Sequence, residues 1–191
     1  MENAGRRSGR GWRSGLAALD TCRGMPGMRG AAVIAYLADG GDERISFGAG
    51  AITHMLAHRQ LNAGAAEAGG QLFARLSEGR IDVEVATGPN PADRRSRLYF
   101  APSRVHERRE IRELHRRGLH YVGDWHTHPQ PVPSPSDVDL RNISEIFRQS
   151  RHSYAGILLV IIGQLEPPAG IYVGIANSQG VAALVPLSFP T

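Results

Sequence analysis

Apolar and polar residues alternate along the chain with the periods typical of strands and helices. Ile81, Val83 and Val85 are separated by single polar residues, which is the two-residue period of a strand with one buried face. Residues 156–163 form a nearly unbroken apolar run, much shorter than the roughly 20 residues of a membrane-spanning helix, and predict a buried strand. Residues 51–61 place apolar side chains at helical spacing. The whole pattern predicts strands over 31–38, 44–48, 70–76, 80–87, 97–101, 119–128, 156–163, 170–176 and 181–187 and helices over 51–61, 103–117 and 136–150.

Strands and helices are mixed along this order, and short turns containing Gly, Pro, Asp or Asn join several neighbouring strands. Such short connections favour antiparallel neighbours. We therefore expect an α/β fold with a mixed, mostly antiparallel sheet flanked by about three helices. A length of 191 residues without a visible repeat is typical of one domain. We place this domain at residues 30–191, after a basic and flexible N-terminal arm at residues 1–29.

The charge of the chain is concentrated in this arm. Residues 1–29 contain six Arg against Glu2 and Asp20, so the arm accounts for the net charge of +4 and the remaining chain is neutral. A neutral domain argues against nucleic acid as its partner, although a basic arm can contact phosphates or anionic lipid. All 22 basic residues are Arg, which biased codon usage explains; protection from modification on a side-chain amine is the alternative.

The single cysteine, Cys22, excludes an internal disulfide framework and a zinc site of four thiolates. A metal site in this chain would therefore use His and carboxylate ligands. The arm lacks the apolar stretch of roughly 7 to 15 residues found in an export signal. We expect a cytoplasmic protein with no membrane partner.

The segment that indicates chemistry begins with His126-Thr127-His128 at the end of a predicted strand. Because side chains alternate between the two faces of a strand, His126 and His128 project to the same side and can bind one ion. A catalytic zinc takes three protein ligands and a water, so a third ligand must come from elsewhere. Asp139 is the best candidate, because the Pro-rich turn before it can return the next helix to the end of the strand.

Each of these residues has an ordinary structural interpretation. A pair of His in a strand is more often a surface or core feature, and Ser136 followed by Asp139 resembles a helix cap. Taken together, however, His-x-His, seven residues, Ser, two residues and Asp specify four positions. A chance match is on the order of one in a thousand, so we favour the metal site.

Hydrolysis also requires a base for the water, preferably a carboxylate that does not bind the metal. Glu67 is our candidate, because it lies at the entrance of a predicted strand beside two glycines that permit close backbone approach. A solvated loop glutamate is the ordinary alternative. Glu78, Glu84 and Asp124 are rivals, and Asp124 shares a strand face with both His, where it can orient an imidazole.

The combination of Glu67, His126, His128, Ser136 and Asp139 resembles the pattern of the JAMM (JAB/MPN+) zinc metalloproteases. The surrounding sequence is similar to that of small bacterial JAB peptidases found with ubiquitin-like conjugation enzymes, including those of CBASS antiphage operons. The likeness covers about residues 30–188. It implies a single MPN/JAB domain with a cytidine-deaminase-like fold.

The resemblance also implies roles for these residues. His126, His128 and Asp139 would bind Zn²⁺, Glu67 would act as the base, and Ser136 would donate a hydrogen bond to the water or the oxyanion. The reaction would be hydrolysis of a peptide or isopeptide bond after the C-terminus of a ubiquitin-like modifier. Activating- and conjugating-enzyme-like operon partners are implied as well, and the inserted segment Gly88–Ser103 would pair with the extended tail of the modifier.

Three alternatives remain open at this stage. The chain can be a catalytically silent MPN scaffold, although such members usually lack the ligands. It can be a nucleic-acid protein that binds through its basic arm. It can also be a JAB peptidase with another substrate, such as a sulfur-carrier protein or a cell-wall peptide.

Overall fold

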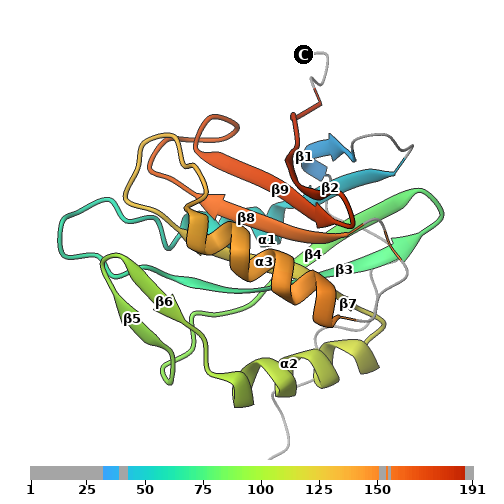
Figure 1. Cartoon of the computed structure of the whole chain (residues 1–191), viewed down its shortest axis with the longest axis horizontal. Coiled ribbons are helices and arrows are strands. Elements are labelled where there is room, and N and C mark those ends of the chain that lie inside the picture. The colour runs from blue at the N-terminus through green and yellow to red at the C-terminus, as the bar shows by residue number, and fades with distance from the viewer. Residues whose placement is uncertain (1–31, 39–42, 151–153, 155, 188–191) are drawn as a thin grey trace, which may run out of the picture.

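A computed structural model describes residues 32–38, 43–150, 154 and 156–187 (Figure 1). The arm at residues 1–29 and the turn at residues 39–42 lie outside this description. Within it, no helix combines the length and the apolar composition needed to cross a membrane. The elements in chain order are β1 (Ala32–Leu37), β2 (Arg44–Gly48), α1 (Ala49–Leu56), β3 (Gly69–Ser77), β4 (Arg80–Ala86), β5 (Arg94–Ser96), β6 (Tyr99–Ala101), α2 (Arg104–Arg116), β7 (His120–Thr127), α3 (Asp137–Gln149), β8 (Ile157–Ile162), β9 (Ile171–Asn177) and β10 (Gly180–Ala183).

Eight strands form one sheet in the order β1-β2-β4-β3-β7-β8-β9-β10. Only the β2/β4 and β7/β8 pairs are parallel, which confirms the expected mixed, mostly antiparallel sheet. The chain after β10 returns to β1, where Pro186 forms a β-bridge with Tyr36 and the Leu187 N–H donates to the Ala35 carbonyl. The outer side of β1 is thus covered by the end of the described chain, which limits edge-to-edge pairing with another molecule.

The apolar run of β8 is continuous because both faces of the sheet are covered at this strand. Leu158, Val160 and Ile162 belong to the large core cluster that includes α1, whereas the alternate residues Ile157 and Ile161 pack with α3. Helices α1 and α3 therefore lie on opposite faces of the sheet (Figure 1). A third, smaller cluster seats α2 against β3 and β7.

The structure differs from the sequence-based expectation in three elements. Helix α1 ends at Leu56 rather than at residue 61, and the last strand ends at Ala183 rather than at residue 187. Strand β5 was not expected, because its three residues are all exposed and carry no apolar alternation. It forms a two-stranded sheet with β6, and we call this pair, Arg94–Ala101, the inserted hairpin.

Gly70 lies where β3 passes close to the chain that follows β4. A Cβ added at Gly70 would lie 1.9 Å from the carbonyl oxygen of Thr87, which is backbone and cannot rotate away. We expect Gly70→Ala to lower the free energy of unfolding by about 1–3 kcal/mol, the usual effect of overpacking. Urea denaturation measures this change.

Gly50→Ala is the matched control, because a Cβ there would meet only the Glu84 carbonyl oxygen, at an ordinary 3.9 Å. Gly50 lies in α1, where alanine is the better helix former. This variant should keep or raise the stability. An equal loss in both variants would show that close approach at Gly70 is not the cause.

Candidate metal centre

His126 and His128 meet at the end of β7. Their Nε2 atoms are 3.1 Å apart and their ring centroids 4.8 Å apart. His126 is the second-last residue of the strand, and the His128 N–H donates to the carbonyl of Ile162 at the end of β8. The strand therefore directs both imidazoles to one point, as its two-residue period requires.

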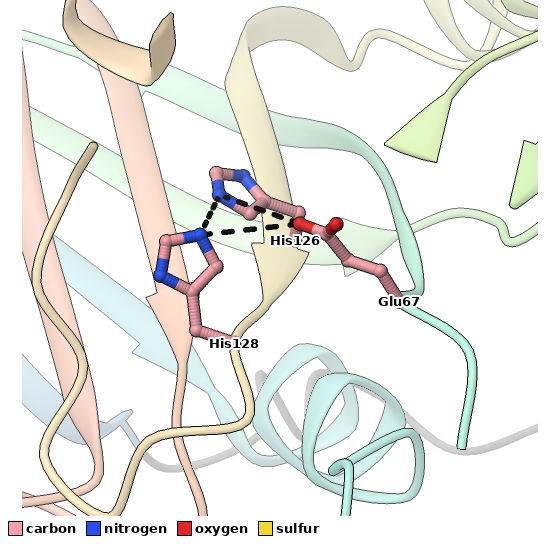
Figure 2. Close-up of side chains that lie close together, drawn as sticks. All are labelled: Glu67, His126 and His128. Carbon is pink, nitrogen blue, oxygen red and sulfur yellow. Dashed lines mark hydrogen bonds and ion pairs between the residues drawn. The ribbon is translucent and has the colours of Figure 1, made fainter. Parts of the chain in front are cut away.

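Two carboxylates approach the same point from other elements. Glu67 Oε1 lies 4.0 Å from His126 Nε2 and 3.9 Å from His128 Nε2. Asp139 approaches more closely, with Oδ1 3.4 Å from His126 Nε2 and Oδ2 3.5 Å from His128 Nε2. Figure 2 shows Glu67 reaching the two imidazoles from a separate segment of the chain. All four side chains are mostly buried, with exposed fractions of 9–16%.

The donor set of this cluster fits a divalent metal ion. One atom each of Glu67, His126 and His128 lie within 4.8 Å of one another. Burial, and then the neighbouring His126, lowers the pKa of His128 and favours the neutral ring that a metal requires. Two imidazole nitrogens and carboxylate oxygens are ligands that zinc accepts. The geometry places both Glu67 and Asp139 in reach of such an ion.

Ser136 and Asp139 form a capping box at the N-terminus of α3. The Asp139 N–H donates to Ser136 Oγ, while Asp139 Oδ2 accepts from the Ser136 N–H and hydroxyl, both at 2.7 Å. The helix-cap interpretation is therefore correct, and the same carboxylate also faces both imidazoles. Partial desolvation raises the pKa of Asp139, but hydrogen bonds from His126 and Ser136 outweigh this effect and hold the pKa well below its usual range. Asp139 is a carboxylate at neutral pH.

Glu67 has the opposite electrostatic behaviour. Desolvation raises its pKa to about 7; the imidazole of His126 opposes this change, and the charge of Asp139 adds to it. A carboxyl group with this pKa can both accept and release a proton near neutral pH, which is what a general base needs. The two carboxylates of the cluster are thus suited to different tasks.

The backbone around Glu67 is held by contacts that the sequence analysis did not identify. The Ala68 N–H donates to Thr127 Oγ1, and the Thr127 N–H donates to the Ala68 carbonyl. The Thr127 hydroxyl in turn donates to the side-chain oxygen of buried Gln60. On the other side, Arg95 Nε donates to the Glu67 carbonyl at 2.6 Å. Most of these contacts involve main-chain atoms, so a pattern of residue types in the sequence does not predict them.

The three rival acids lie in other environments. Glu78 is exposed in the turn between β3 and β4, and Glu84 forms an ion pair with Arg75. Asp124 accepts a hydrogen bond from the Tyr121 hydroxyl at 2.9 Å; among the described residues, no hydrogen bond joins it to an imidazole. Among the described residues, Glu67 lies close to His126 and His128, whereas these three acids are not part of that group.

Helix α2 contributes a buried acid to the surroundings of Asp124. Glu107 of this helix is only 8% exposed and pairs with Arg104 at 3.0 Å. Loss of hydration, followed by the charge of Glu107, raises the pKa of Asp124 to about 7.

Comparison with known proteins agrees with this arrangement. Residues 49–175 match the family model of prokaryotic homologues of the JAB domain, and the chain belongs to this family. A protein of Vibrio cholerae serotype O1 is 31% identical over 118 residues, which cover 60% of this chain and 73% of the relative. A protein of Enterobacter hormaechei is 36% identical over 118 residues, covering 59% and 62%. Both relatives are named CD-NTase/cGAS isopeptidase.

The fold is also found among solved structures. A solution structure of a protein from Desulfitobacterium hafniense superposes with a TM-score of 0.54 and 23% sequence identity, covering 73% of this chain and 88% of that chain. At this identity the likeness shows the fold alone. The match to the family model, and not this likeness, confirms the JAB/MPN domain that the resemblance implied.

The raised pKa of Asp124 generates a prediction about stability. Between about pH 4 and 7 the folded protein keeps this proton while the unfolded chain has lost it, so stability falls as the pH rises through this window. Asp124→Asn removes the titration and keeps an acceptor for Tyr121. The stability of the variant relative to the wild type should rise across the window, by on the order of 1.4 kcal/mol per pH unit.

Urea denaturation of chelator-treated protein at pH 5 and pH 8 measures this difference. Glu78→Gln in the exposed turn is the control and should change little between the two pH values. Parallel stability profiles for Asp124→Asn and the wild type would contradict the prediction.

Proposed function

We propose that this chain is a zinc-dependent isopeptidase or peptidase that cleaves after the C-terminus of a ubiquitin-like modifier. The observation that carries the proposal is the convergence of two imidazoles with two carboxylates of opposite pKa behaviour. Membership of the JAB family and the isopeptidase names of two relatives support the reaction class. Conjugates that contain a CD-NTase are the substrate class that those names suggest. The antiviral operon is the setting that the resemblance implies.

In this proposal His126, His128 and Asp139 hold Zn²⁺. Asp139 suits this role because it stays ionised and lies closer to both imidazoles than Glu67 does. The metal would supply Lewis acidity for the scissile carbonyl and lower the pKa of a water to about 7.

Glu67 moves the proton. Its carboxylate accepts a proton from the attacking water and then donates this proton to the departing amine, which a pKa of about 7 permits in both directions. The hydroxyl of Ser136 points at Asp139 Oδ2 in this structure. Rotation about its χ1 angle would allow it to donate instead to the developing oxyanion.

The inserted hairpin is the proposed binding place of the modifier tail. It lies within the segment Gly88–Ser103, and its strands β5 and β6 pair only with each other among the described residues. Leu98 in its turn and Tyr99 at the start of β6 are exposed. An extended tail can add to such an edge through main-chain hydrogen bonds. A Gly-Gly end has no side chains to clash in a narrow channel.

Replacing the proposed ligands should remove the metal. His126→Ala, His128→Ala and Asp139→Ala each delete one donor, and we expect bound zinc and cleavage of a modifier fusion to fall to background. Metal analysis of the purified protein and a fluorescent-fusion cleavage assay measure the two effects. His120→Ala, at the other end of β7, is the matched control and should retain both. Full activity in the metal-free wild type would refute the metal assignment.

Replacing Glu67 should separate metal binding from turnover. Glu67→Gln keeps the shape of the side chain but cannot accept the proton, so zinc content should be unchanged while kcat falls about 10²- to 10⁴-fold. The same two assays give the answer. If Glu67→Gln also lost zinc, Glu67 would be a ligand rather than the base; if it kept full activity, another acid would be the base.

A further inference from the structure

Glu67 is held in place by two different parts of the structure, one on each side. Its own peptide groups bind the inserted hairpin: the Glu67 N–H donates to the Ser96 carbonyl at 2.7 Å, and the Glu67 carbonyl accepts from Arg95 Nε at 2.6 Å. The peptide groups of the next residue, Ala68, bind Thr127, which lies between the two His in the sequence. The hydrogen-bond partners of the backbone thus change from the hairpin at Glu67 to strand β7 at Ala68.

We propose that the inserted hairpin positions Glu67 and that Arg95 is the positioning residue through which it does so. This inference rests on the proposed role of Glu67 as the base. Arg95 is suited to the task because its guanidinium is a planar, permanently charged donor that reaches two successive carbonyls, those of Glu67 and, at 3.4 Å, Ala66. Hydrogen bonds from a charged donor are stronger than neutral ones.

Buried Gln60 also links the hairpin to the segment that contains Glu67. Its side-chain amide donates to the Ala65 carbonyl at 3.1 Å and to the Arg97 carbonyl of the hairpin at 2.8 Å, while its oxygen accepts from the Thr127 hydroxyl. One side chain that is 1% exposed thus joins the loop before Glu67, the hairpin and the strand that carries both His. The hairpin is therefore fixed relative to the metal centre.

This arrangement couples substrate binding to the position of the base. If the modifier tail pairs with the hairpin, the element that receives the substrate is the one that holds the Glu67 backbone. A displacement of a catalytic group by about 1 Å costs on the order of 100-fold in rate. Arg95 should therefore affect turnover and not affinity. Its side chain is exposed, and among the described residues it forms no hydrogen bond with His126 or His128.

The test compares Arg95→Met, Arg95→Lys and Arg112→Met in the zinc-loaded protein. Arg112 is exposed in helix α2, outside the hairpin and the metal centre, so Arg112→Met removes the same charge by the same substitution at a site without a proposed role. For Arg95→Met we expect unchanged zinc content and melting temperature, unchanged KM for a modifier fusion, and a kcat lower by about 10- to 100-fold. Arg95→Lys should recover part of this loss, and Arg112→Met should behave as the wild type.

Amide hydrogen exchange gives a second readout that does not depend on activity. In Arg95→Met the Glu67 amide, bound to Ser96, should exchange faster, while the Ala68 amide, bound to Thr127, should keep its protection. Wild-type kcat in Arg95→Met, a loss confined to KM, or an equal loss in Arg112→Met would overturn the inference. If the wild type failed to cleave any modifier fusion, the proposed function would fail, and the exchange rates would still decide whether Arg95 positions Glu67.

Discussion

The antiparallel pairing of β3 with β7 is the constraint on which the site depends. It sets Gly69 opposite His126 and so brings the segment that contains Glu67 to the end of the strand that contains both His. Thr127 then fixes the position of the Glu67 segment. Its hydroxyl accepts from the Ala68 N–H and its own N–H donates to the Ala68 carbonyl, 59 residues earlier in the chain. A slip of one residue between these strands would turn the imidazoles to the other face of the sheet and away from Asp139.

The cluster also shows how one small volume gives two carboxyl groups different properties. Asp139 lies at the N-terminus of a helix and accepts hydrogen bonds from Ser136, so its charge is stabilised. Within the described part of the chain, Glu67 receives no comparable side-chain donors, and desolvation is the main cause of its raised pKa. Such separation of neighbouring acids is a common way of assigning acid–base roles. The division follows from local structure: a cap on one side and a buried loop on the other.

The sequence was sufficient to predict those parts of the fold and the site that depend on the pattern of side chains. The alternation in β4, the apolar run of β8 and the spacing of His126, His128 and Asp139 are visible in the residues themselves, and the predicted sheet class is confirmed. Strand β5 could not be predicted, because Arg-Arg-Ser forms a strand only through its partner β6. The hydrogen bonds that position Glu67 could not be predicted from the sequence either, because they use main-chain carbonyls that every residue possesses.

The contact that covers β1 has a consequence for how the molecule folds. Tyr36 and Pro186 are joined although nearly the whole domain lies between them in the sequence. Closing so long a loop costs chain entropy that local contacts do not repay, so this contact belongs late on the folding pathway. During synthesis β1 emerges well before Pro186 and Leu187, which cover its outer side, so this side is open to premature pairing until the end of the domain has been made.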